Sequence, residues 1–188
     1  MGILIRMAER RDINGIMELL KYIARHHHEG RPDIFLDGGS KYNAAELEAI
    51  LNDADRPIFV AVETGENAAT SAAGAETGVA GAETGAARTD TEAAAGSVLG
   101  YCFCIVKRFS DHAVIKDYSS LYIDDFCVDP NKQKRGVGKL ILNMAKEYAK
   151  QIGVYEIDLN VWEFNEGAIK FYERCGFVTQ RRHMELIL

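Results

Sequence analysis

A short stretch beyond the middle of the chain combines glycines and basic residues in a spacing that could bind phosphate. Gln133 is followed by Gly136 and Gly138. The basic residues around them are Lys132, Lys134, Arg135 and Lys139. The hydrophobic pattern predicts a strand before this segment and a helix after it. A helix begins with backbone N–H groups that have no partner within the helix, and its dipole adds partial positive charge there, so its start can hold an anion.

Two common phosphate-binding loops do not fit this stretch. A P-loop requires GxxxxGK[ST], but Leu140 stands where Ser or Thr is needed. A dinucleotide-binding loop requires a third glycine at the position that Ile141 occupies. What remains is the pattern Gln-x-x-Gly-x-Gly, placed directly after the predicted strand of residues 121–129.

This pattern resembles the pyrophosphate loop of the GNAT superfamily, the acetyl-CoA-dependent N-acetyltransferases. A second block, residues 165–177, is similar to the family segment Asn-x-x-Ala-x-x-Phe-Tyr-x-x-x-Gly-Phe. Both blocks occur in the order and at the separation of that family, so together they are more specific than either alone. The resemblance is clearest over residues 98–188 and looser over residues 3–63. It implies a single N-acetyltransferase domain over residues 1–188.

The resemblance implies an α/β fold in which three layers, α/β/α, are built around a mixed and splayed central sheet. In such a sheet the pantetheine arm of the co-substrate lies along the central strand like an added neighbour. Main-chain groups of Phe126, Cys127 and Val128 are then expected to bind this arm. Asn165 is expected to bind it too, to cap its helix, or both. The residues expected to hold the pyrophosphate are Gln133, Lys134, Arg135, Gly136, Val137, Gly138 and Lys139.

Direct acetyl transfer to a primary amine has three chemical requirements. The amine must lose a proton, the oxyanion must be stabilised, and the departing thiolate must be protonated. Tyr172 matches the general acid of the resembled family, and a phenol keeps its proton at neutral pH. For the base we expect Asp125 first and Asp124 second, acting directly or through water; the resembled family often has an acid on this strand, but not at one fixed place. Each Asp could instead orient a cationic amine or bond a loop, and Tyr172 could instead be a packed aromatic residue.

Neighbouring strand residues point to opposite faces of a sheet. Asp124 and Asp125 can therefore face one pocket only if a β-bulge lies between them. In the resembled family, the region between the first two helices forms a wall of the acceptor pocket. Candidate lining residues there are Arg31, Phe35 and Tyr42, although they could equally anchor the loop.

Three consecutive histidines, His26 to His28, invite a metal-binding hypothesis. Neighbouring side chains on a helix point about 100° apart, so all three cannot converge on one ion. We expect them on the surface or at a pocket rim, where one could carry a proton. The four cysteines form no CxxC pair, so no metal site is expected.

Hydrophobic periodicity predicts the remaining elements. Strands are expected at about residues 3–8, 57–63, 98–109, 121–129, 156–162, 177–182 and 183–188. Helices are expected at about residues 13–28, 44–51, 137–152 and 165–175. Residues 64–97 are almost entirely Ala, Gly, Thr, Ser and Glu, a composition that cannot bury enough apolar surface to fold. We expect a low-complexity, flexible insert in the hairpin between two strands; a partner-binding segment is the alternative.

Composition limits the possible functions. The chain has 188 residues, of which 47% are hydrophobic, and its net charge is −6, which fits one domain with a sizeable core. Neither the insert nor the rest is basic overall, which argues against a nucleic-acid surface. No apolar run approaches the roughly 20 residues that cross a membrane, and the N-terminus does not resemble a signal peptide. A cytoplasmic location is therefore expected.

The resemblance leaves three functions open. The first is an acetyltransferase that uses acetyl-CoA as co-substrate, without a metal, and a small-molecule or peptide amine as acceptor. The second is a non-catalytic acyl-CoA sensor, and the third is an acetyltransferase acting on protein lysines or N-termini. Relatives often pair through their C-terminal strands, so a homodimer is a further expectation.

Overall fold

The computed structural model describes residues 2–64, 97–133 and 135–188. A five-stranded sheet lies at its centre, with the strand order β1-β2-β3-β4-β5. The strands are β1 (Gly2–Met7), β2 (Ile58–Thr64), β3 (Val98–Phe109), β4 (Tyr118–Val128) and β5 (Glu156–Leu159). The first four pair antiparallel, whereas β5 runs parallel to β4. The sheet is therefore mixed, as predicted.

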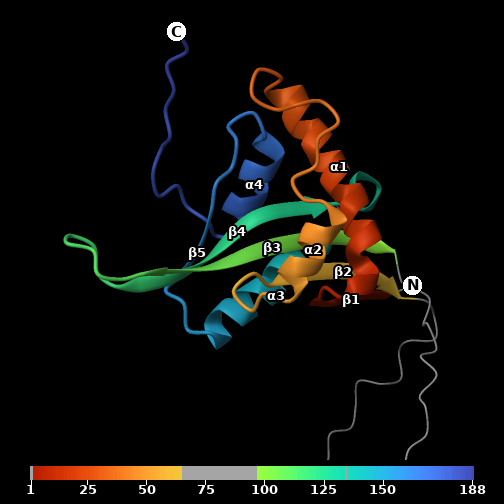
Figure 1. Cartoon of the computed structure of the whole chain (residues 1–188), viewed down its shortest axis with the longest axis horizontal. Coiled ribbons are helices and arrows are strands. Elements are labelled where there is room, and N and C mark those ends of the chain that lie inside the picture. Colours follow the sequence, from red (N-terminus) through yellow and green to blue (C-terminus); the bar gives the residue numbers. More distant parts are fainter. Residues whose placement is uncertain (1, 65–96, 134) are drawn as a thin grey trace, which may run out of the picture.

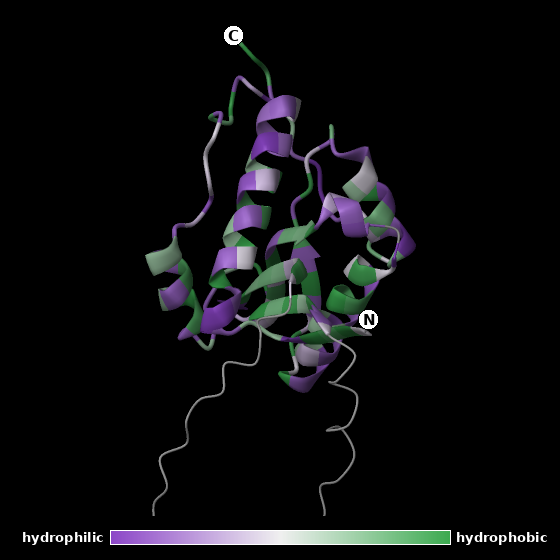
Figure 2. Ribbon diagram, turned by 90° about the vertical axis from the view of Figure 1, so that its right-hand side faces the viewer, coloured by the Kyte–Doolittle hydropathy of each residue, from purple (hydrophilic) through white to green (hydrophobic). Residues whose placement is uncertain are grey.

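Helices cover both faces of this sheet (Figures 1 and 2). They are α1 (Ile13–Gly30), α2 (Ala44–Leu51), α3 (Val137–Gln151) and α4 (Glu166–Arg174), with short 3-10 turns η1 (Arg10–Asp12) and η2 (Pro130–Lys132). The helices α1 and α2 share a core with one face, and α3 shares a core with the other. This is the predicted α/β/α order. Of the helices that the structure describes, none is both long and apolar enough to cross a bilayer.

Local sequence explains where the helices form. Ile13, Ile16 and Leu20 recur at helical spacing, and all three are buried under α1, as an amphipathic helix requires. At the start of α2, the Asn43 side chain accepts from Glu46 N (3.0 Å) and the Glu46 side chain accepts from Asn43 N (2.8 Å). This reciprocal capping box fixes the first turn.

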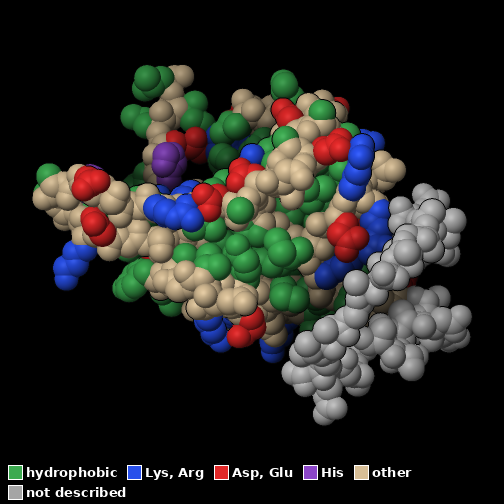
Figure 3. All heavy atoms as spheres, turned by 60° about the horizontal axis from the view of Figure 1, so that its bottom comes forward, with side chains coloured by type: hydrophobic (Ala, Val, Ile, Leu, Met, Phe, Trp, Pro, Cys, Tyr) green, Lys and Arg blue, Asp and Glu red, His purple; other side chains and the backbone are tan. Residues whose placement is uncertain are grey.

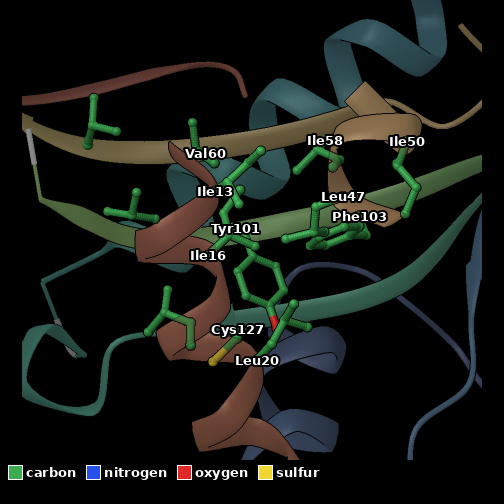
Figure 4. Close-up of a cluster of buried hydrophobic side chains, with 13 residues drawn as sticks. Ile13, Ile16, Leu20, Leu47, Ile50, Ile58, Val60, Tyr101, Phe103 and Cys127 are labelled. Carbon is green, nitrogen blue, oxygen red and sulfur yellow. The ribbon is translucent and has the colours of Figure 1, made fainter. Parts of the chain in front are cut away.

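The strands β3 and β4 are held between two cores. Along β3, Tyr101 and Phe103 enter the core under α1 and α2, while Cys102 and Cys104 enter the core under α3, because side chains alternate along a strand. Figure 4 shows Tyr101 in the middle of the first core, beside Cys127 of β4. The centre of the sheet is thus packed on both sides.

The prediction of two last strands at residues 177–182 and 183–188 is wrong, because residues 177–188 form no strand. Gly176 turns the chain at the end of α4 with a φ of 92°, and the following segment runs away from β5 (Figure 1). Arg31 of the α1–α2 connection holds this segment through Glu185 (Nη1–Oε1 2.6 Å). A strand needs a neighbouring strand to accept its hydrogen bonds, and an apolar pattern by itself does not supply one.

Other boundaries agree closely with the predictions. The strand β4 begins earlier than predicted, at Tyr118, and β5 ends earlier than predicted, at Leu159. The predicted flexible insert lies outside the described residues, apart from its two end positions.

Candidate active site

The strands β4 and β5 separate partway along β4. They are paired from Ser120–Glu156 to Ile123–Leu159, but β4 continues to Val128. On the side facing β5, residues 124–128 have no strand partner within the part of the chain that the structure describes. The predicted splay of the sheet is therefore confirmed.

The register between β3 and β4 decides which main-chain groups face this gap. Asp129 N donates to Leu99 O (2.9 Å), and Cys102 lies opposite Phe126. Because the hydrogen-bonding direction alternates along a strand, the N–H groups of Phe126 and Val128 point away from β3 and into the gap. Cys127 directs its amide toward β3 and its side chain into the core, where burial raises the pKa of its thiol to about 12.

The helix α3 starts at the far end of the gap. Gly136 precedes it in a left-handed conformation (φ 79°), which suits glycine. Gly138 lies so close to the Phe171 ring that a Cβ there would be 3.3 Å from it. Among residues 2–64, 97–133 and 135–188, nothing accepts a hydrogen bond from the amides of Val137, Gly138 or Lys139. The start of α3 therefore offers the free N–H groups that an anion site requires.

The cations beside this helix start are loosely paired. Lys132 Nζ lies 3.6 Å, and Arg135 Nη1 3.9 Å, from Glu63 Oε1 at the end of β2. Gln133 Nε2 donates to Val128 O over 3.4 Å, while Lys134 falls outside the described residues. Lys132 and Arg135 can thus turn to a phosphate without breaking a close ion pair.

A β-bulge brings the two adjacent aspartates of β4 to the same face. Phe103 lies opposite Asp125 but Cys104 lies opposite Ile123, so Asp124 is the extra residue. Asp124 Oδ2 accepts a hydrogen bond from Tyr42 (2.6 Å), and Asp125 Oδ1 accepts one from Tyr101 (3.2 Å). Both tyrosines belong to the core under α1 and α2. The bulge that the sequence required for a shared pocket is present.

Asp125 is poised as a proton acceptor. Burial raises the pKa of its carboxyl from 3.8 to about 6, because a charge loses hydration in the protein interior. Lys41 and the Tyr101 hydroxyl oppose this rise, whereas Asp124 adds to it. Asp125 is therefore ionised at neutral pH, yet more basic than an ordinary aspartate.

Asp124 is already engaged by neighbouring groups. Lys41 Nζ lies 2.9 Å from Asp124 Oδ1 and donates to the Asp124 carbonyl oxygen over 2.8 Å. Arg56 Nη2 donates to the Tyr42 hydroxyl oxygen (2.9 Å), which in turn donates to Asp124. Burial and the Asp124 hydrogen bond raise the pKa of Tyr42, so its hydroxyl stays protonated. Of the two aspartates, Asp125 is the freer to accept a proton.

The helix α4 places Tyr172 beside the gap-lining part of β4. Its ring lies 6.2 Å from Phe126 and 5.5 Å from Phe177, between ring centres. Burial, with a contribution from Asp125, raises the pKa of Tyr172 well above its usual value. Its hydroxyl forms no hydrogen bond with the described residues, and the raised pKa keeps it protonated at neutral pH. Asn165 caps α4 by accepting from Ala168 N (3.1 Å).

Arg31, Phe35 and Tyr42, the three residues predicted to line the acceptor pocket, lie in two places. Tyr42 contacts Asp124, whereas Phe35 packs between His27 (5.0 Å) and Trp162 (5.2 Å). Arg31 stacks over Trp162, 5.9 Å from the ring centre, and pairs with Glu185. The structure thus brings Tyr42 to the aspartates, while Phe35 and Arg31 join an aromatic group at the end of α1.

The histidines take part in the same aromatic group. His26 and His27 both lie beside Phe164, at 5.9 and 6.3 Å between ring centres, and His28 Nδ1 lies 2.8 Å from Phe35 O. Burial lowers the pKa of His27, with help from His26 and Lys41. Within the described residues, no three His, Cys, Asp or Glu side chains gather around a common metal position.

Sequence reasoning missed Lys41, Tyr101 and Trp162. A hydrogen bond from Tyr101 could have been expected, because a buried tyrosine hydroxyl usually has a partner. The sequence does not indicate which residue that partner is. No spacing rule links Lys41 to Asp124, since they are 83 positions apart. Their contact depends on how the α1–α2 connection crosses β4.

A surface hollow of about 310 Å³ adjoins this network. The residues that line it are Lys41, Tyr42, Glu46, Ala49, Ile50, Asp53 and Arg56. Lys41 and Tyr42 therefore contact Asp124 as well as the hollow.

Comparison with known proteins identifies the family. A family model described as the acetyltransferase (GNAT) family matches residues 21–177. The chain belongs to the GNAT family. Both motif blocks recognised in the sequence, at 133–138 and 165–177, lie within the matched range.

Individual GNAT relatives match shorter stretches. An uncharacterized N-acetyltransferase of Methanocaldococcus jannaschii is 37% identical over 82 residues, which are 44% of this chain and 35% of that protein. Glucosamine 6-phosphate N-acetyltransferase of Trypanosoma brucei brucei is 33% identical over 67 residues, 36% of this chain and 44% of that protein. The aligned stretches thus span less than half of these curated relatives.

Solved structures share the GNAT fold over nearly the whole chain. A mutant of the BH1408 protein from Bacillus halodurans superposes with a TM-score of 0.78 at 23% identity, covering 98% of this chain and 99% of that one. An aminoglycoside N-acetyltransferase in complex with CoA superposes with a TM-score of 0.61 at 13% identity, covering 98% of each chain. At these identities the likeness concerns the fold.

Proposed function

We propose that residues 1–188 form one GNAT domain that transfers an acetyl group from acetyl-CoA to a primary amine by direct attack. The observation that carries this proposal is the gap between β4 and β5. It begins beside two aspartates and leads to the open helix start of α3. A gap of this kind provides main-chain donors for an extended ligand along one strand and for an anion at its end.

The residues of the gap fit the parts of acetyl-CoA. The N–H group of Val128 would bond the pantetheine arm, that of Phe126 would face the thioester carbonyl at its end, and the loop of residues 133–139 would hold the pyrophosphate. From Val128 back to Asp124 the strand extends roughly 13 Å at about 3.3 Å per residue. The thioester would therefore lie near the start of the gap, beside Asp124 and Asp125. A similar fold solved with CoA supports this choice of ligand.

Each chemical step has a residue within reach. Asp125 takes a proton from the acceptor ammonium, directly or through water, and the freed amine attacks the thioester carbonyl carbon. The Phe126 N–H faces the gap where negative charge would develop on the carbonyl oxygen. As the carbon–sulfur bond breaks, Tyr172 gives its hydroxyl proton to the sulfur. The attacking nitrogen, positively charged after the attack, gives up its second proton, which returns to Tyr172 through solvent, and Asp125 releases its own proton to solvent.

Two carboxylates beside the gap favour a cationic acceptor, either a small molecule or a peptide. On the face that Figure 3 shows, acidic and basic side chains are interspersed rather than forming a continuous basic surface. This arrangement supports a small or peptide amine over nucleic acid as the partner. A protein lysine or N-terminus is the alternative acceptor within the same chemistry.

The test is a CoA-release assay with acetyl-CoA and a panel of primary amines. Tyr172→Phe should lower the rate while CoA still binds, because only the acidic proton is removed. Tyr155→Phe is the matched control, since Tyr155 is 80% exposed and lies outside the site. If the protein binds CoA but releases none from acetyl-CoA with any amine, the proposed acetyltransferase function is wrong and the acyl-CoA sensor is favoured.

A further inference from the structure

A primary ammonium group of the chain itself lies at the start of the gap. Lys41 Nζ is 2.9 Å from Asp124 Oδ1 and donates to Asp124 O over 2.8 Å. Asp124 directly follows Ile123, the last residue of β4 that is paired with β5. The ammonium therefore lies where the two strands begin to part.

This is also the place that an acceptor amine has to reach. If the arm extends along β4 from α3, its reactive end lies near Asp124 and Asp125. An acceptor arrives as an ammonium ion, and the Asp124 carboxylate and carbonyl oxygens are groups at this place that could receive it. Lys41 already occupies both of them.

We propose that Lys41 is an internal competitor of the acceptor: a primary alkylammonium group replaces the Lys41 ammonium on Asp124 before Asp125 removes its proton. This inference rests on the proposed function. It defines the acceptor as an amine on an unbranched alkyl carbon, like that of lysine itself, because such a group offers the same three N–H donors in the same space. Asp124 then acts as the binding residue for the acceptor, and Asp125 as its base.

The structure allows Lys41 to leave without disturbing the rest of the network. The Lys41 side chain is 39% exposed, whereas that of Asp124 is 14% exposed. Lys41 also borders the hollow of about 310 Å³, which contains Glu46 and Asp53 as alternative carboxylates. Tyr42 stays in place, since it stacks on Phe103 (5.5 Å between ring centres) and is bonded by Arg56. Only one flexible side chain has to move.

The test replaces Lys41 by Met, which keeps the length of the side chain and removes its ammonium. Lys41→Met should lower the KM for alkylamines roughly two- to fivefold, the range expected when a partly exposed ion pair no longer competes. Lys21→Met is the matched control, because Lys21 forms a 2.9 Å surface pair with Glu18 away from the site. An unchanged or higher KM in folded Lys41→Met protein would overturn the inference.

A double-mutant cycle separates competition from general charge repulsion. If Lys41 competes for Asp124, then Lys41→Met should give a clearly smaller fall in KM once Asp124→Asn has removed the carboxylate, because only the Asp124 carbonyl oxygen is then left to compete for. An equal fall in both backgrounds would mean that Lys41 acts through its charge alone, and the inference would be wrong. Circular dichroism and thermal unfolding verify the fold, and Lys41→Gln replaces the Met variant if that one does not fold.

Equilibrium binding of n-butylamine to CoA-loaded protein, measured by calorimetry, distinguishes this inference from the proposed function. If n-butylamine binds more tightly to Lys41→Met than to the unchanged protein but no amine is acetylated, the inference about Asp124 stands and the proposed acetyltransferase function is wrong. If amines are acetylated but Lys41→Met changes neither the KM nor the affinity for n-butylamine, the proposed acetyltransferase function stands and the inference about Lys41 is wrong.

Discussion

Replacing Asp125 by Asn should remove a base and, at the same time, stabilise the fold. The side chain keeps its shape, and its amide oxygen can still accept the hydrogen bond from Tyr101. What disappears is the negative charge, which burial disfavours. Loss of a general base typically lowers a rate by roughly 100- to 10,000-fold, and we expect a fall of that order in kcat.

The gain in stability follows from the pKa of Asp125. Its pKa rises from 3.8 to about 6 on folding, and each pKa unit corresponds to about 1.4 kcal/mol. The folded protein therefore binds this proton more tightly than the unfolded chain does. The neutral form is fully favoured below about pH 4, and stability falls as the pH rises to about 6. Above that pH, the charge costs at most about 3 kcal/mol.

Chemical unfolding of the two proteins at about pH 8 and about pH 4 measures this term. We expect Asp125→Asn to raise the free energy of unfolding by about 1–3 kcal/mol at the higher pH and to change it little at the lower pH. The rate of the unchanged enzyme should rise through about pH 6 as Asp125 loses its proton. A variant that keeps the rate would refute Asp125 as the base, and an equal gain at both pH values would refute charge burial as the cause.

Two further variants test other parts of the site and the assembly. Gly136→Ala should lower the free energy of unfolding by about 1–2 kcal/mol, because the left-handed φ of 79° strains a residue with a Cβ. The same change should weaken CoA binding in a calorimetric titration. Undiminished affinity for CoA would argue against the start of α3 as the phosphate site. The homodimer stays a prediction: Leu186→Glu with Ile187→Glu, at positions 84% and 76% exposed, should convert a dimer into a monomer in sedimentation velocity. A dimer that survives both changes would place the interface elsewhere.

Much of the fold could be predicted because its signals are local. Helical spacing of Ile13, Ile16 and Leu20 specifies the buried stripe of α1 regardless of what it packs against. Gly136 and Gly138, placed between a strand and a helix, specify an open helix start in the same way. The two motif blocks then identified the family.

Pairing between distant segments could not be predicted in the same way. The final strands were predicted from a pattern that includes apolar residues such as Leu186 and Ile187, but residues 177–188 pair with no strand in the part of the chain that the structure describes. The length of β5 was overestimated for a related reason, since its partner β4 is lost after Ile123. Strand boundaries depend on the partner as much as on the strand.

The sequence by itself determined the fold family, the phosphate-binding turn and the residue types from which a base and an acid could come, because these depend on local spacing and composition. Only the tertiary structure decided what each candidate can do. The bulge turns Asp124 and Asp125 to one face, burial raises the pKa of Asp125, and Lys41 comes from 83 positions away to hold Asp124. A carboxylate becomes a base or a binding group through its neighbours, and folding brings those neighbours together.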